Sequence, residues 1–206
     1  MTPQEILDIL EKEFPDADSE LYFEDNFQLL IAVTLSAQAT DVAVNKVTPA
    51  LFKAYPDAFS MAKASVKDIE SYIRTLGLYR NKARFLLETS QMLVSDYDGI
   101  VPDTYTDLIR LPGVGRKTAN VVLAVGFKKP AIAVDTHVDR VAKRLGFANE
   151  NDSVLEVEKK LMHIFEAKDW AKAHYLLLLF GRYHSTARNQ SDAYELLEAL
   201  KEKHQL

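Results

Sequence analysis

Helical spacing of the apolar residues runs through almost the whole sequence and restricts the fold more than any other feature. In "NKARFLLETSQMLVSDY" the apolar residues recur at helical intervals, and "NFQLLIAVTLSAQ" is apolar on nearly every side, as a buried central helix would be. Only "AIAV", residues 131–134, could form a strand. The pattern predicts roughly ten helices joined by short connections, which is an all-α fold.

Helix-start residues support this interpretation. Three capping boxes are predicted, each a Ser or Thr followed three residues later by an acidic residue: Thr2–Glu5, Ser65–Asp68 and Ser153–Glu156. The connection "KKPA" near Pro130 is the best candidate for a boundary between subdomains, because proline interrupts helix formation.

Composition excludes several classes of protein. Cysteine is absent, which excludes disulfides, thiolate metal sites and cysteine nucleophiles. The five histidines show no metal-ligand spacing, so we expect no protein metal site. No apolar run reaches the length that spans a bilayer, and the acidic, amphipathic N-terminus resembles no signal or transit peptide. We therefore expect a cytoplasmic protein that does not associate with membranes.

The net charge of −5 is unevenly distributed. Residues 1–25 hold nine acidic residues and one lysine, whereas residues 110–144 hold eight basic residues and two acidic ones. Such asymmetry suggests a face built for an anionic partner, although charge also fluctuates along ordinary chains.

The stretch "LPGVGRKTANVV" holds two of the seven glycines within three residues, Gly113 and Gly115. It is typical of a helix, a tight turn and a second helix, with Gly115 expected to take a backbone conformation closed to other residues. Glycines also let backbone N–H groups approach a phosphate closely, which explains how an acidic protein could hold DNA. A bare G-x-G favours an ordinary αα-hairpin; the leucine-proline start and the basic pair that follows sharpen the signal.

Lys117 and Asp135 are the candidate catalytic residues. Lys117 stands near the positive end of the second helix, which disfavours the ammonium form, and partial burial would disfavour it further. A neutral amine can attack a sugar carbon, whereas an ordinary surface lysine is the alternative. Asp135, in "AIAVDTHVDRVAKR", is a natural N-cap whose carboxylate could stabilise an oxocarbenium-like sugar. A purely structural cap is the alternative, and the pairing with Lys117 favours catalysis.

Four motifs resemble endonuclease III, a family of helix-hairpin-helix DNA glycosylases. They are "LPGVGRKTANVV", "AVDTHVDRV", "LSAQATDVAVNK" and "GLYRNKA", and they lie in register over nearly the whole chain. The resemblance implies two helical lobes with the active site in the cleft between them. Residues 20–130 would form a six-helix barrel domain containing the hairpin, and residues 1–19 with 131–206 would form a second helical domain.

The resemblance also implies the reaction and its residues. The enzyme would be a bifunctional glycosylase and AP lyase that removes oxidised pyrimidines from duplex DNA, flips the target nucleotide and cleaves the abasic site by β-elimination. Lys117 would form the Schiff base and Asp135 would be the catalytic carboxylate. Double-stranded DNA with damaged pyrimidines or abasic sites is the expected partner of a monomeric, nucleoid-associated protein. The expected DNA-contact residues are Gln38, which fills the gap left by the flipped base; Leu78, a wedge; Gly113, Val114 and Gly115, which hold phosphate; and Arg116 and His137.

Two alternatives stay open. The adenine-removing mismatch glycosylases share the hairpin and the aspartate, are monofunctional, and typically carry serine where this chain has Lys117. A non-catalytic DNA-binding protein with a helix-hairpin-helix motif is the second, although binding alone would need neither Lys117 nor Asp135.

One departure from the family is large. Endonuclease III commonly binds a 4Fe–4S cluster through four C-terminal cysteines, at positions that here are Ser185, Asp192, Glu195 and Lys201. None of these can supply a thiolate, so no such cluster and no other cofactor is expected. The apolar residues of "SDAYELLEALKEK" instead predict an amphipathic helix, capped by Ser191 or Asp192, that takes over the structural role of the cluster.

Overall fold

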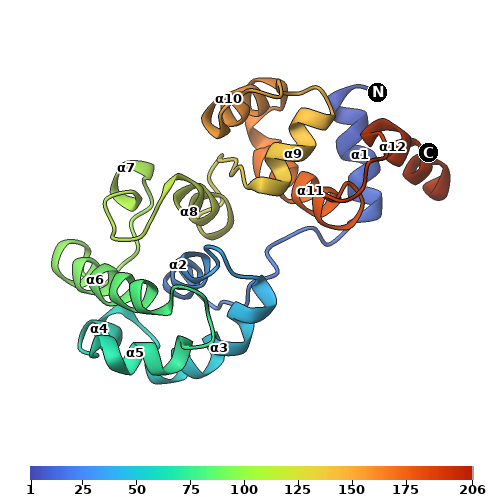
Figure 1. The fold of residues 1–206 in the computed structure, drawn as a ribbon. Coiled ribbons are helices and arrows are strands. Elements are labelled where there is room, and N and C mark those ends of the chain that lie inside the picture. Colours follow the sequence, from blue (N-terminus) through green and yellow to red (C-terminus); the bar gives the residue numbers. More distant parts are fainter. Residues whose placement is uncertain (206) are drawn as a thin grey trace. The chain divides into compact units, whose positions relative to one another are not determined.

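Every regular element in the described part of the chain, residues 1–205 of a computed structural model, is a helix (Figure 1). The predicted all-α fold is confirmed. Residues 131–134, the one segment that could have formed a strand, are buried and belong to no helix or strand. Among the described residues, no helix is long and apolar enough to cross a membrane.

The chain divides into two compact units. The central unit comprises residues 20–129, and the terminal unit comprises residues 1–19 together with 130–206. The central unit contains α2 (Asn26–Leu35), α3 (Asp41–Ala54), α4 (Ala58–Ala62), α5 (Val66–Ile73), α6 (Tyr79–Tyr97), α7 (Tyr105–Leu108), α8 (Arg116–Val121) and the π-helical turn η1 (Val122–Gly126). The terminal unit contains α1 (Pro3–Glu13), α9 (Thr136–Arg144), α10 (Val154–Ile164), the 3₁₀ turn η2 (Ala167–Asp169), α11 (Trp170–Tyr183) and α12 (Ala193–His204).

Helix α2 forms the centre of the central unit. All residues from 27 to 35 are buried, as the continuous apolar pattern predicts. The helix contacts α3, α6, α8 and η1, so apolar neighbours surround it on every side. This burial explains why α2 lacks the polar stripe of a surface helix.

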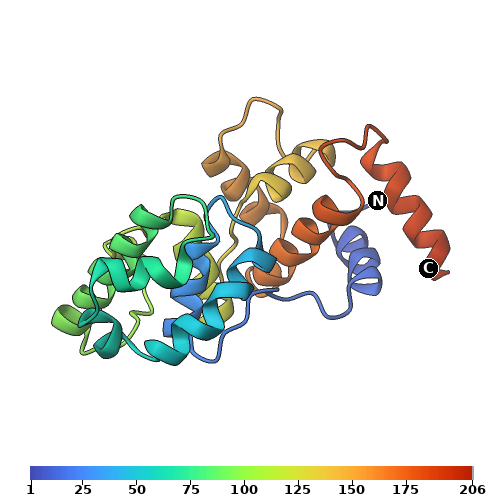
Figure 2. The same ribbon diagram turned by 60° about the horizontal axis from the view of Figure 1, so that its bottom comes forward.

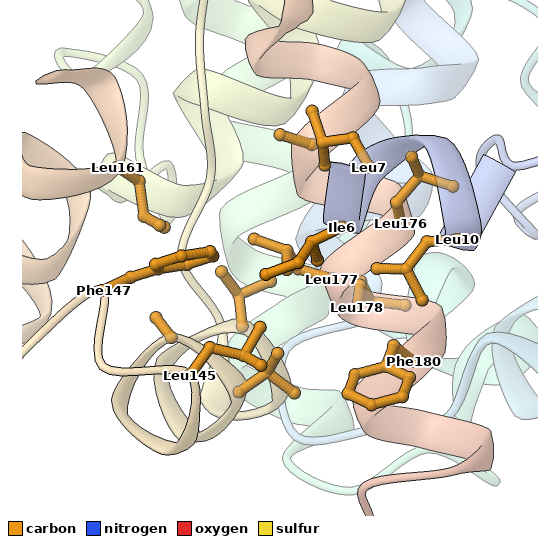
Figure 3. Packing of buried hydrophobic residues seen from close by; sticks show 14 of the residues in the cluster. Ile6, Leu7, Leu10, Leu145, Phe147, Leu161, Leu176, Leu177, Leu178 and Phe180 are labelled. Carbon is orange, nitrogen blue, oxygen red and sulfur yellow. The ribbon is translucent and has the colours of Figure 1, made fainter. Parts of the chain in front are cut away.

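The core of the terminal unit lies between helices from both ends of the chain. Figure 3 shows Leu7 and Leu10 of α1 beside Leu176 and Phe180 of α11, all with no measurable exposure. Full burial of such a side chain stabilises a fold by about 1.5–3 kcal/mol. The N-terminal helix is therefore an integral part of the core of this unit.

The predicted helix starts are confirmed. All three capping boxes form, and in each the Ser or Thr hydroxyl accepts a hydrogen bond from the backbone N–H three residues later. A cap of this kind contributes about 1 kcal/mol.

The C-terminal segment folds as the expected amphipathic helix, α12, whose N-cap is Asp192 (Figure 2). Its apolar face buries Leu197 and Leu200, and the helix packs against α1. The Glu13 carboxylate at the end of α1 accepts hydrogen bonds from three side chains near the C-terminus: His184 (3.0 Å), Lys203 (2.6 Å) and His204 (2.8 Å). Apolar packing and hydrogen bonds to the Glu13 carboxylate therefore connect the N-terminal helix with the C-terminal segment.

Two arginines of α9 contact the end of α11 and the loop that precedes α12. Arg140 donates to the carbonyl oxygens of Gly181 (2.7 Å) and Ser185 (3.1 Å). Arg144 donates to the Ser185 hydroxyl (2.9 Å) and to the carbonyl oxygen of Thr186 (3.0 Å). These guanidinium groups donate to oxygens in the last turn of α11 and in the residues directly after it.

Candidate nucleic-acid interface

The predicted hairpin in the central unit is confirmed: α7 is followed by a tight turn and then by α8. The turn is closed by a hydrogen bond from the Val114 N–H to the carbonyl oxygen of Leu111 (3.1 Å). Gly113 has φ +75°, the left-handed conformation that side chains disfavour. A Cβ added there would lie 2.8–2.9 Å from atoms of Phe85, so both conformation and space require glycine.

Gly115 differs from the expectation. Its φ of −94° and ψ of −179° are extended backbone that any residue can adopt, and a Cβ there would meet nothing within 4 Å. The positive φ that the sequence suggested for Gly115 belongs to Gly113. Gly115 instead opens α8 as its N-cap and leaves uncovered space beside the backbone. Such space is what the approach of a ligand to backbone N–H groups requires.

Lys117 lies in the first turn of α8 and is exposed. No side chain caps the start of this helix, which is its positive end. The partial burial considered for this lysine is absent, because α8 presents it on the surface. The Nζ atom can therefore reach a bound molecule without a change in the fold.

Arg116 is held beside Lys117 by Tyr105 of α7. Its Nη1 donates to the Tyr105 hydroxyl (3.0 Å), and its guanidinium lies 5.3 Å from the centre of the Tyr105 ring. A cation stacked on an aromatic ring loses part of its freedom to rotate. Tyr105 thus fixes one of the two charges at the hairpin, a role that the sequence analysis did not assign.

Gln38 and Leu78 share an unusual backbone conformation. Gln38 follows α2 with φ 54°, Leu78 precedes α6 with φ 59°, and both are exposed. Leu78 is 55% exposed, so an apolar side chain points into solvent from a strained residue. Left-handed conformations at non-glycine residues concentrate at functional sites. The two loops approach each other, since a Cβ on Gly77 would lie 4.0 Å from the Gln38 carbonyl oxygen.

Asp135 of the terminal unit caps α9. Its Oδ1 accepts hydrogen bonds from the backbone N–H groups of His137 (2.9 Å) and Val138 (2.8 Å). Both bonds end on the same oxygen of the carboxylate. The preceding segment is anchored by His174, whose Nδ1 lies 2.7 Å from the carbonyl oxygen of Ala133. Asp135 is therefore held from both sides.

His137 is fixed within the terminal unit. Its Nδ1 lies 3.2 Å from Nη2 of Arg140, and its Cβ and carbonyl oxygen lie where a side chain on Gly181 would have to go. Because an arginine can only donate, Nδ1 is the acceptor and the ring proton is on Nε2. The structure thus gives His137 a packing role beside Asp135, and its contact with DNA stays a prediction.

The positions that would hold iron do not fit the cluster. Ser185 is fully buried and its hydroxyl accepts from Arg144. Asp192 caps α12, and Glu195 and Lys201 are residues of that helix. Serine, carboxylates and an ammonium group in a regular helix do not make a thiolate set for iron.

A cavity of about 590 Å³ in the central unit lies apart from these residues. It is lined by residues of α2, α3 and the segment before α2, among them Tyr22, Gln28, Thr48 and Phe52. None of the predicted DNA-contact residues borders it. The predicted DNA-contact residues lie on loops and helix starts, and all are exposed except Val114, which is buried, and His137, which is half-buried.

Comparison with known proteins gives a consistent family. Residues 31–167 match the model of the HhH-GPD superfamily base excision DNA repair proteins. The chain is 49% identical to endonuclease III of Bacillus subtilis (strain 168) over 183 residues, which are 89% of this chain and 84% of that protein. It is 45% identical to endonuclease III of Escherichia coli (strain K12) over 184 residues, which cover 89% and 87% of the two chains.

Solved structures show the same likeness. A trapped covalent intermediate of endonuclease III with DNA has a TM-score of 0.89 and 48% identity, and the match covers 99% of each chain. A non-covalent complex of endonuclease III with DNA has a TM-score of 0.89 and 47% identity over 100% of each chain. A thermostable thymine-DNA glycosylase shares the fold at a TM-score of 0.78 and 21% identity, covering 94% of this chain and 95% of the other.

Proposed function

The chain belongs to the endonuclease III family of HhH-GPD base excision DNA repair proteins, and from that membership we propose how its own residues carry out the reaction. The protein is a DNA glycosylase and abasic-site lyase that acts on duplex DNA. Its substrates are oxidised pyrimidines, and it works on nucleoid DNA in the cytoplasm. The observation that carries the assignment of residues is the exposed Lys117 on the uncapped first turn of α8, directly after the hairpin.

The first step is displacement of the base. The unprotonated Nζ of Lys117 forms a bond to C1′ of the deoxyribose, and the bond between C1′ and the base breaks. The base takes the electron pair of that bond and leaves with the proton that the amine nitrogen loses when it bonds to C1′. Positive charge develops on the sugar during this step, and a nearby carboxylate stabilises it. Asp135 supplies the carboxylate, with Oδ2 available because Oδ1 accepts both N–H groups of its own helix.

The second step cleaves the strand. The sugar ring opens as the C1′–O4′ bond breaks and O4′ takes a proton from water, and the amine nitrogen and C1′ form a protonated Schiff base. This cation acidifies the C2′ proton; water takes that proton, and the electrons of the C2′–H bond form a C2′–C3′ double bond. The bond between C3′ and its oxygen breaks, and the phosphate leaves with the electron pair. Hydrolysis by water then frees Lys117.

The predicted DNA-contact residues make C1′ of the target sugar accessible to Lys117. A nucleotide in a duplex must be extruded before its C1′ can be attacked, and the resulting gap must be filled. Gln38 and Leu78, presented on strained loops, fill the gap and separate the neighbouring bases. The backbone of residues 113–115 holds a phosphate, and Arg116 adds a positive charge beside it.

Borohydride trapping tests the proposal. Duplex DNA with one abasic site should give a reduced covalent adduct with the wild type and with Lys67→Ala, a control that removes an exposed lysine of α5. Lys117→Ala should give no adduct, because the nucleophile is gone. Asp135→Asn should slow base release from a duplex that contains thymine glycol. An adduct with Lys117→Ala would contradict the assignment, whereas base release without strand cleavage by the wild type would favour a monofunctional glycosylase.

A wild type that binds abasic duplex and leaves both bonds intact would identify a non-catalytic DNA-binding protein. Duplex with adenine opposite 8-oxoguanine distinguishes the mismatch glycosylases. We expect no release of adenine from it, since this chain has Lys117 where those enzymes typically have serine.

A further inference from the structure

A buried hydroxyl connects the hairpin to a helix far from it in the sequence. Thr89 lies in the middle of α6, is 3% exposed, and donates a hydrogen bond to the carbonyl oxygen of Pro112 (2.7 Å). Pro112 is the residue before the left-handed Gly113, so the bond ends on the tightest part of the turn.

This bond is a departure from what a threonine in a helix ordinarily does. A helical Ser or Thr commonly donates to the carbonyl oxygen one turn earlier in its own helix. The neighbouring Ser90, also fully buried, does so and donates to Leu86 (2.8 Å). The Thr89 hydroxyl points across to the hairpin instead. The two adjacent hydroxyls are thus similarly buried, but one donates to the hairpin and the other donates within its own helix.

Phe85, one turn before Thr89, makes the second contact. Its Cβ and ring atoms lie 2.8–2.9 Å from where a Cβ on Gly113 would be. The turn therefore rests on the aromatic side chain, while the Thr89 hydroxyl fixes the carbonyl group one residue earlier. The contact with Phe85 sets the distance between the turn and α6, and the hydrogen bond from Thr89 sets the orientation of the Pro112 carbonyl group.

The same helix begins at the wedge residue. Leu78 is the N-cap of α6, eleven residues before Thr89, which corresponds to about 16 Å along the helix axis. An α-helix of this length is stiff compared with a loop. The wedge residue Leu78 and the phosphate-binding turn therefore both contact one stiff helix, α6, and its length sets the distance between them.

We propose that Thr89 is a positioning residue for the reaction: its hydroxyl holds the hairpin in the orientation that presents the phosphate-binding N–H groups and Lys117 to DNA bound at the Leu78 wedge. This inference rests on the proposed function. Thr89 is buried and touches no substrate, so it acts only through Pro112 and the turn. A displacement of a nucleophile by about 1 Å can reduce a rate by up to a hundredfold, so a single well-placed hydrogen bond can matter.

The test compares Thr89→Val, Thr89→Ser and Ser90→Ala. Valine keeps the shape of threonine without the hydroxyl, serine restores the hydroxyl, and Ser90→Ala removes the neighbouring buried hydroxyl that bonds within α6. Two quantities are measured with abasic duplex, below the melting temperature of every variant. They are the single-turnover rate of strand cleavage at saturating enzyme and the slope of log Kd against log salt concentration.

We expect Thr89→Val to cleave about tenfold more slowly and to show a shallower salt slope, by up to about 0.9 for one lost phosphate contact. Thr89→Ser and Ser90→Ala should match the wild type within about twofold. A Thr89→Val variant with wild-type rate and slope would overturn the proposal, and so would a Ser90→Ala variant that loses as much. Failure of the proposed function is distinguishable, because the wild type itself would then neither form a borohydride adduct nor cleave the strand.

Discussion

Gly113 and Gly115 stand two residues apart in the hairpin, yet a side chain at each would meet a different obstacle. At Gly113 the backbone is left-handed and Phe85 fills the space. At Gly115 the backbone is extended and the space is open. The first glycine is therefore required by the fold, whereas in our proposal the second is required by the ligand.

Alanine substitution should separate the two roles. Gly113→Ala should lower the free energy of unfolding by about 2–4 kcal/mol, since a left-handed alanine costs about 1 kcal/mol or more and the clash with Phe85 adds strain. Gly115→Ala should change it by less than about 0.5 kcal/mol and weaken binding to abasic duplex about tenfold, because a methyl group would occupy the space of the phosphate. Chemical denaturation and a binding titration measure the two effects.

The result for Gly115→Ala tests whether this glycine is required by the ligand. Normal stability with normal binding would mean that the phosphate does not approach here. A large loss of stability would mean that the open space beside Gly115 is filled in solution.

At the scale of elements, the prediction is that apolar packing of α12 takes over the structural role of a cluster. Leu197 is fully buried on the face that meets α1, and Ala199, two residues later on the same helix, is exposed. Leu197→Asp should lower the free energy of unfolding by about 3 kcal/mol or more, since it buries an unpaired charge and leaves a cavity. Ala199→Asp is the matched control and should cost less than about 0.5 kcal/mol in thermal or urea melts. Equal melting of the two variants would show that α12 does not dock.

The acidic end of α1 makes stability depend on pH. Burial raises the pKa of Glu13, but hydrogen bonds from Lys203, His204 and His184 more than offset it and lower the pKa from 4.5 to about 2. Because the folded-state pKa is depressed, the stabilisation is fully present above about pH 4.5 and is lost as the pH falls towards 2. The loss should be on the order of 2–3 kcal/mol.

Glu13→Gln tests this directly. The variant should be less stable than the wild type at pH 7, and the difference should shrink steadily between pH 4.5 and pH 2. Urea denaturation across this range provides the measurement. A difference that stays constant with pH would show that the Glu13 carboxylate contributes through its shape alone.

For the whole molecule, the sequence predicts well what is local and poorly what depends on distant partners. Helices, their capping boxes and the burial of α2 follow from residues within a few positions of each other, so spacing reveals them. His174 anchors Ala133 from 41 residues away, and Thr89 reaches Pro112 from 23 residues away. No periodicity encodes such pairs. The sequence also could not tell which glycine of the hairpin is left-handed, since G-x-G permits either.

The distant pairs matter most where the chain departs from its family. In the C-terminal region, the guanidinium groups of Arg140 and Arg144 contact the end of α11 at Gly181 and the residues after it, Ser185 and Thr186. A guanidinium group connects segments of the chain well because it donates to several oxygens at once. A hydrogen-bonded connector of this kind contains no redox-active atom.

Two consequences can be tested together. Protein produced with an iron chelator should match iron-replete protein in melting temperature and strand-cleavage rate, because no cysteine is available to bind a cluster. Arg144→Met, which removes the donor to the buried Ser185 hydroxyl and one of two donors to the Thr186 carbonyl oxygen, should lower the free energy of unfolding by about 1–3 kcal/mol, whereas exposed Arg188→Met should not. Destabilisation by the chelator would point to a metal bound elsewhere. An unaffected Arg144→Met variant would mean that α12 alone holds the C-terminal region in place.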